Sequence, residues 1–97
     1  MQTMLVMNIN PELEEDMVDY LLGQEFISGF TSYQVNGHGA FSNMSLAEQV
    51  SGRRKRVQIE VLLEQTAVNK ILEGLKSQVG ADIVYWEQAI TNHGRID

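Results

Sequence analysis

The sequence predicts an α+β fold: a ferredoxin-like βαββαβ sandwich, in which two helices cover one face of a four-stranded antiparallel sheet. Three observations lead to this prediction. Four segments have the apolar or alternating pattern of strands, and two amphipathic segments typical of helices lie among them in the order β-α-β, β-α-β. The length of 97 residues suits one domain rather than two. We therefore expect a single domain that spans residues 1–97.

The first half of the chain predicts the first β-α-β unit. Residues 4–9 are apolar and predict a strand that is buried on both faces. Asn10 followed by Pro11 favours a helix start, because Asn caps helices and Pro fits the first helical position. Acidic residues fill the first turns of this helix, which should run to about Gln24. Residues 30–35 alternate in polarity and predict the second strand.

The second half predicts a further unit after a long connection. Apolar and polar residues alternate over residues 57–64, which predicts the third strand. Apolar residues at helical spacing predict an amphipathic helix over residues 68–79, and residues 82–89 read as the fourth strand. Residues 36–56 contain three glycines and little apolar periodicity, which predicts a long exposed loop. Loops of this length in small domains are usually functional or mobile.

Composition and charge exclude several classes of protein. The chain has no cysteine, which excludes disulfide scaffolds, thiol nucleophiles and cysteine-based metal sites. The net charge is −6, and four of the seven basic residues are adjacent in Arg53-Arg54-Lys55-Arg56. This distribution argues against general nucleic-acid binding and allows one local anion site. The longest apolar run is too short to span a membrane and lacks a basic segment before it, so we expect a cytoplasmic protein.

No residue pattern in the chain indicates an enzyme. There is no Gly-x-Ser-x-Gly turn and no spacing of Ser, His and an acid that suggests a triad. Most acids of the N-terminal half lie in the first predicted helix, where they fit a solvated helix start. Met1, Met4 and Met7 are three apart, which on a strand places Met4 and Met7 on opposite faces. These methionines therefore predict core packing rather than a soft-metal site.

Two features remain open as binding residues. The run Arg53-Arg54-Lys55-Arg56 is either a solvated loop end or an anion site, because Arg forks match phosphate oxygens; binding to nucleic acid is a further alternative. His38 lies between two glycines that let backbone N–H groups approach a ligand. His38 and His93 are either surface histidines or contacts for a metal or an anion.

The predicted sheet also has a face that neither helix covers. The first and third strands are too apolar for full exposure, so we expect a homo-oligomer that packs sheet against sheet.

Residues 35–64, VNGHGAFSNMSLAEQVSGRRKRVQIEVLLE, resemble the corresponding part of the PII signalling superfamily. In that superfamily a glycine-containing turn leads into a long exposed loop, and a Lys/Arg-bearing segment leads into a strand of the form V-x-I-E-V. The helix over residues 67–79 and the ending at residues 90–95 are also similar to their PII counterparts. More closely, the chain resembles a small proteobacterial PII-like family of unknown function, whose members are often found beside heavy-metal efflux systems.

This resemblance implies a PII-like homotrimer of ferredoxin-like subunits, with the sheets inside and the long loops projecting outward. PII proteins bind adenine nucleotides between subunits and dock the long loop onto a partner, often a transporter or an enzyme. The chain departs from the family in having Ala40 after Gly39 and no Gly-Asp-Gly-Lys sequence after Gly80. The candidate positions for a nucleotide or anion are Gly37, Gly39, Arg53, Arg54, Arg56 and Arg95.

The sequence thus predicts a non-enzymatic, PII-like regulatory protein, whose ligand-responsive loop docks onto a partner such as a transporter or efflux component. The alternative is a metal-binding or metal-tolerance protein similar to the trimeric CutA-type proteins, which share this architecture. In that case the candidate metal ligands are His38, His93 and Glu48, since imidazole and carboxylate groups bind zinc or copper. A small ferredoxin-like enzyme is the third hypothesis.

Overall fold

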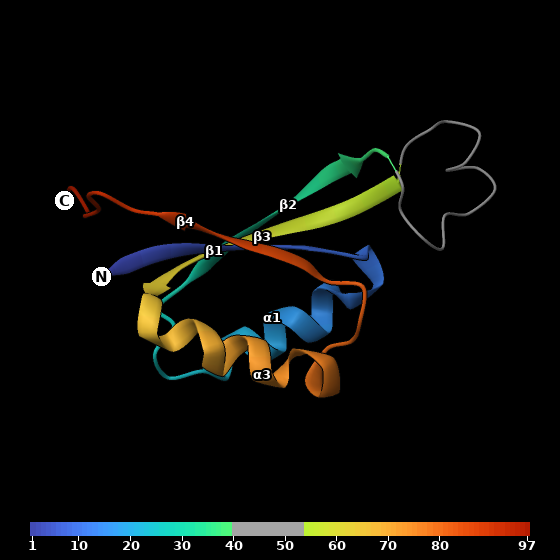
Figure 1. Cartoon of the computed structure of the whole chain (residues 1–97), viewed down its shortest axis with the longest axis horizontal. Helices are drawn as coiled ribbons and strands as arrows, with labels where there is room; N and C mark the ends of the chain where they lie inside the picture. Colours follow the sequence, from blue (N-terminus) through green and yellow to red (C-terminus); the bar gives the residue numbers. More distant parts are fainter. Residues whose placement is uncertain (40–53) are drawn as a thin grey trace.

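The computed structural model describes residues 1–39 and 54–97, and its strands form one antiparallel sheet in the order β2-β3-β1-β4 (Figure 1). Helices α1 and α3 lie on the same side of this sheet (Figure 1). The predicted ferredoxin-like α+β fold is thereby confirmed. In chain order the elements are β1 (Gln2–Ile9), η1 (Pro11–Leu13), α1 (Glu14–Leu22), β2 (Phe30–Gly37), β3 (Arg54–Glu64), η2 (Gln65–Ala67), α3 (Val68–Gln78) and β4 (Val84–Ala89).

The core lies between the sheet and the helices. The two central strands, β1 and β3, present alternate residues to the helices, and the register pairs Leu5 with Val61 and Met7 with Ile59. The helices contribute apolar side chains at helical spacing, such as Met17 and Leu21 of α1 and Ile71 of α3, all fully buried. Each buried side chain of this size stabilises the fold by roughly 1.5–3 kcal/mol. The alternation along residues 57–63 therefore fixes which face of β3 meets the helices.

The first helical segment begins where the sequence predicts. The Asn10 side chain accepts a hydrogen bond from the Glu12 backbone N–H at 2.9 Å, and Pro11 takes the first position. The segment starts as the short helix η1 and continues as α1, which ends at Leu22, two residues before the predicted end.

The predicted loop over residues 36–56 is too long at both ends. Strand β2 continues to Gly37, and β3 begins at Arg54, so that Asn36 pairs with Lys55 and Gly37 pairs with Arg54. Backbone pairing with β2 makes these residues strand despite their polar side chains. The remainder of the predicted loop, residues 40–53, lies outside the described residues. Strand β4 begins two residues later than predicted, at Val84, because Asp82 has a left-handed backbone with φ of 60°.

Among residues 1–39 and 54–97, no helix covers the sheet face opposite α1 and α3 (Figure 1). Val84 and Trp86 of β4 lie on this face, since the register pairs them with Asn8 and Val6, and they are 46% and 39% exposed. Strand β1 is less buried than predicted, because Met4 and Asn8 on the same face are only half-buried. In the described part of the chain, no helix has both the length and the apolar character needed to cross a membrane.

Candidate functional site

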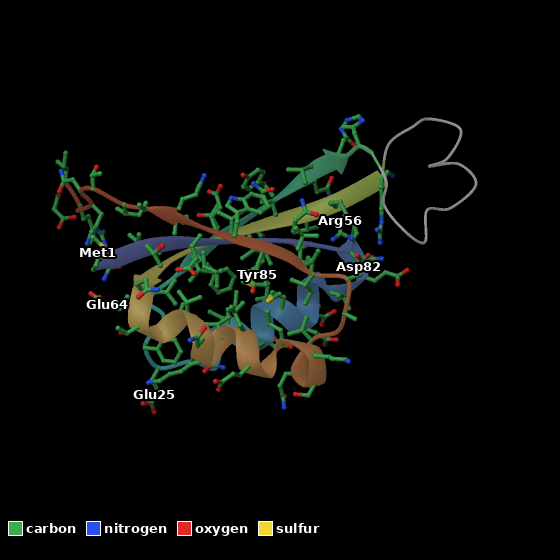
Figure 2. The ribbon with its side chains drawn as sticks, in the orientation of Figure 1. Met1, Glu25, Arg56, Glu64, Asp82 and Tyr85 are labelled. Atoms are coloured by element: carbon green, nitrogen blue, oxygen red, sulfur yellow. The ribbon has the colours of Figure 1, made fainter. Side chains whose placement is uncertain are left out.

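A cluster of charged side chains lies at one end of the sheet. Because all neighbouring strands are antiparallel, β1 and β2 end at this edge while β3 and β4 begin there. The edge therefore gathers the basic start of β3 and the turn before β4. Figure 2 shows Arg56 and Asp82 at this end, and Met1 and Glu64 at the opposite end.

The fully buried guanidinium of Arg56 is the centre of this cluster. Its Nε donates to Asn8 Oδ1 at 2.6 Å, and its Nη2 donates to the backbone oxygens of Asn8 at 2.8 Å and of Asp82 at 2.9 Å. Its Nη1 lies 3.2 Å from Asp82 Oδ2. Arg56 thus joins the end of β1 and the turn before β4 to its own strand, β3.

Arg54 adds a second cation to the same carboxylate. Its Nη2 donates to Asp82 Oδ2 at 2.6 Å, and the side chain is only 3% exposed. Asp82 itself is 33% exposed. We name Arg54, Arg56, Asp82 and Asn8 the Arg–Asp cluster. Its three charged side chains carry a net charge of +1, so the cluster favours anions.

The pKa shifts in the cluster agree with this geometry. Burial lowers the pKa of the Arg56 guanidinium, and the charge of Asp82 opposes this effect. Burial also acts to raise the pKa of the Asp82 carboxyl, but the hydrogen bond from Arg54 and the charges of both arginines outweigh it. The pKa of Asp82 is therefore below its ordinary value, and the carboxylate is ionised at neutral pH.

A groove lies beside the Arg–Asp cluster, between the start of the first helical segment and the paired strands β2 and β3. It has a volume of about 340 Å³, within the range of small-molecule sites. Several polar residues line it, so it suits a small polar ligand. The lining residues are Pro11, Gln34, Val35, Asn36, Lys55 and Arg56.

The structure separates the predicted ligand-binding residues into two groups. Gly37 and Gly39 lie at the same end of the sheet as the Arg–Asp cluster; Gly37 pairs with Arg54, and Gly39 has φ of 101°. Arg95 follows β4, whose last residue pairs with Thr3 at the other end of the sheet, and it forms an exposed ion pair with Asp97 at 2.8 Å. Within a single chain, Arg95 therefore lies far from the Arg–Asp cluster. Arg53 lies outside the described residues.

The predicted metal ligands are also separated within one chain. His38 directly follows β2, whereas His93 follows β4 at the opposite end of the sheet (Figure 1). Glu48 lies outside the described residues. Across residues 1–39 and 54–97, no three His, Cys, Asp or Glu side chains are grouped so that they could hold a metal ion.

The sequence analysis missed Asp82 and Asn8, and it left open that Arg54 and Arg56 end a solvated loop. That alternative is wrong for both arginines, because both are buried and paired with Asp82. The predicted topology could have identified Asp82, because in this antiparallel arrangement the segment before the fourth strand lies beside the start of the third. An acidic residue in that segment can therefore form an ion pair with the basic run.

Comparisons with known proteins agree with the fold. The profile of a family described as "Protein of unknown function (DUF3240)" matches residues 1–97. No curated protein matched the chain. One similar solved structure is a DUF3240 family protein from Shewanella baltica OS155, with 22% identity over 99% of this chain and 97% of that chain and a TM-score of 0.82. Another is the periplasmic divalent cation tolerance protein CutA from Archaeoglobus fulgidus, with 8% identity over 98% and 89% and a TM-score of 0.75.

At these identities the two structures show a shared fold and nothing further. The profile match covers the whole sequence and is the stronger finding for descent. The chain therefore belongs to the DUF3240 family.

Proposed function

We propose that the chain is a cytoplasmic, non-enzymatic regulatory protein of the PII-like kind. In this proposal it binds a small anionic ligand at the Arg–Asp cluster and docks onto a partner, such as a membrane transporter, through residues 40–53. The observation that carries the proposal is the burial of Arg54 and Arg56 around Asp82. Buried ion pairs are often no more stabilising than apolar packing, so a cluster of this kind suits a switch or a binding site.

The position of the Arg–Asp cluster would allow ligand binding to affect the proposed docking segment. Arg54 is the first residue of β3 and pairs with Gly37, the last residue of β2. Residues 38–53 connect these two strand ends in the sequence. A ligand that repositions the Arg54 side chain therefore acts on one of the residues that anchor the connection.

We further propose that the protein forms a homotrimer in which the open sheet faces meet at the centre. The exposed Val84 and Trp86, with the half-buried Met4, give this face an apolar patch. Soluble proteins commonly cover such patches by association with identical chains. The similarity to PII proteins described above supports three as the number of subunits.

Two measurements test the proposed function. Native mass spectrometry of the gently purified protein should give the mass of three chains together with a bound small molecule. Affinity purification from cells should recover the same partner with the full chain but not with a variant in which a Gly/Ser linker of equal length replaces residues 40–51. Variants of residues 90–97 serve as the control and should retain the partner. Equal recovery with the linker variant and an intact trimer would refute docking through residues 40–53.

A metal-binding function is the second candidate, favoured by the fold similarity to CutA from Archaeoglobus fulgidus. Since one chain separates His38 from His93, a shared site would need neighbouring copies. Titration with Zn²⁺ or Cu²⁺ should then show tight binding that is lost when both histidines are replaced by Ala. Equal affinity of the wild type and this double variant would exclude the two histidines as ligands.

A further inference from the structure

Strands β2 and β4 form the two edges of the sheet, and both lack the features that keep edge strands from pairing with other chains. Such features are lysines, prolines, bulges, very short strands or a covering segment. The two strands have eight and six residues, and Glu87 of β4 is the only charged residue in either. In the described part of the chain, no backbone hydrogen bond reaches β2 or β4 from a helix, loop or turn. Within those residues, both edges are open to a further strand.

The directions of the strands make the two edges complementary. Strands β1 and β2 run one way along the sheet, and β3 and β4 run the other way. When two copies lie side by side with their open faces on the same side, β4 of one copy is therefore antiparallel to β2 of the other. This pairing continues the antiparallel pattern of the sheet, which is slightly more stable per residue than parallel pairing.

The side chains on the open face indicate a register for this pairing. Tyr33 of β2 and Trp86 of β4 lie on that face near the middle of their strands, and they are 41% and 39% exposed. If Tyr33 faces Trp86 of the partner subunit, Val35 faces Val84 of the partner subunit, because side chains alternate in both strands. Aromatic and apolar pairs of this kind stabilise neighbouring strands. The register also pairs the whole of β4 with residues 30–35, and no like charges meet, since β2 has no charged residue.

We propose that the outer edge of β2 in one copy pairs with the outer edge of β4 in the next copy, with Tyr33 opposite Trp86 of the partner subunit. Each copy offers one edge of each kind, so the contact is head-to-tail, and a closed ring leaves neither edge unpaired. Pairing of two β2 edges about a twofold axis would instead leave both β4 edges open. The inference rests on the self-association proposed above and names the strands that make it.

Cysteine cross-linking tests the register, because the chain has no cysteine of its own. Thr31 faces Gln88 of the partner subunit in this register, so Thr31→Cys/Gln88→Cys should form disulfide-linked species of two and three chains under mild oxidation. Within one chain the two positions lie on opposite edges of the sheet, about 14 Å apart, which is too far for a disulfide. In the matched control, Thr31→Cys/Val84→Cys, the second cysteine lies about 13 Å along β4 from the expected position. The control should cross-link at least roughly tenfold less.

Hydrogen exchange of the wild type gives a second measurement, which decides the matter if the cysteine variants do not fold. An open edge leaves alternate amides of an antiparallel strand free to exchange, whereas a paired edge protects them. We expect these amides in residues 30–35 and 84–89 to exchange at least roughly tenfold more slowly in the associated protein than after dilution to the monomer.

Three results would overturn the edge pairing. They are equal cross-linking of the control, cross-linking of Thr31→Cys alone, which would indicate pairing of two β2 edges, and unprotected alternate amides in a folded oligomer. Native mass spectrometry separates this failure from failure of the proposed self-association. Three chains without cross-links or protected edges would overturn only the edge pairing, whereas a monomer at every concentration would refute both.

Discussion

Arg56 and Asp82 bond to each other twice, once through side chains and once through the backbone. Arg56 Nη1 lies 3.2 Å from Asp82 Oδ2, and Arg56 Nη2 donates to the Asp82 backbone oxygen at 2.9 Å. The two residues are 26 positions apart, and the contact holds the turn before β4 against the start of β3. The Arg–Asp cluster therefore stabilises the packing of these two segments, and it is also a candidate binding site.

Replacing Arg56 should destabilise the protein strongly. Arg56→Met removes the four hydrogen bonds that Arg56 donates to Asn8 and Asp82 and leaves Asn8 Oδ1 without this donor, so we expect a loss of about 3 kcal/mol in the free energy of unfolding. Arg56→Lys should not rescue this loss, because an ammonium group cannot bond acceptors on both sides as the planar fork does. Urea unfolding at a fixed protein concentration measures both variants.

The matched control for Arg56 is an arginine in an exposed ion pair. Arg95 lies 2.8 Å from Asp97, and the two side chains are 87% and 79% exposed. Arg95→Gln should change the free energy of unfolding by no more than about 0.5 kcal/mol. A comparable loss in the Arg56 and Arg95 variants would contradict the structural role of the cluster.

Asp82 should make the stability depend on acidic pH. Its pKa in the folded state is below the ordinary value of 3.8, so its contribution is fully present above that value. The contribution is lost as the pH falls through the folded pKa, since protonation breaks the ion pairs. The difference in the free energy of unfolding between the wild type and Asp82→Asn should therefore be constant from about pH 7 to pH 5 and shrink below about pH 4.

A second background shows whether the arginines cause this dependence. We compare the free energy of unfolding of Arg54→Gln with that of the double variant Arg54→Gln/Asp82→Asn. This difference should be smaller than the difference between the wild type and Asp82→Asn, and it should depend less on pH. Curves that are identical in the two backgrounds would mean that Arg54 does not lower the pKa of Asp82.

The fold could be predicted from the sequence because its signals are local. The alternation over residues 57–63 and the helical spacing over residues 68–79 each reflect burial of one face of one element. The start of the first helical segment was equally clear, because Asn10 and Pro11 act within one turn. Four strands and two helices in this order leave few other arrangements.

The Arg–Asp cluster could be predicted only in part, because its contacts are not local. The sequence left open whether Arg54 and Arg56 end a solvated loop or form an anion site, since charged residues are buried only when a partner is present. That partner, Asp82, lies 26 residues after Arg56, in the turn before β4, and no periodic pattern marks it. Within one chain Arg95 lies far from the Arg–Asp cluster, because the antiparallel direction of β4 carries the residues after it to the other end of the sheet.

Gly74 should not accept a larger residue, although it lies within helix α3. A Cβ atom there would overlap the Tyr20 hydroxyl group, which donates a hydrogen bond to the Ile71 backbone oxygen at 2.8 Å. Gly74→Ala gains up to about 1 kcal/mol of helix propensity but displaces the tyrosine. We expect a net loss of about 1–2 kcal/mol in the free energy of unfolding.

A double-mutant cycle separates these two effects of Gly74→Ala. In Tyr20→Phe the hydroxyl is absent, and the remaining contacts of the added Cβ with the ring are 3.0 Å and 3.1 Å. The cost of Gly74→Ala should therefore be smaller in this background. Gly29→Ala is the control, since no atom lies within 4 Å of its added Cβ. An equal cost in both backgrounds would rule out the tyrosine as its cause.

The open sheet face should govern self-association. Trp86 lies on this face opposite Val6, and it is 39% exposed in a single chain. Trp86→Glu would place a carboxylate without a partner inside the proposed trimer, which is costly because a buried charge loses its hydration. Light scattering after size-exclusion chromatography should show a shift from trimer to monomer, while circular dichroism stays that of the folded protein. Leu22→Glu is the matched control, because Leu22 is 68% exposed on α1 and its variant should remain trimeric. A trimer that survives Trp86→Glu would show that the chains associate through another surface.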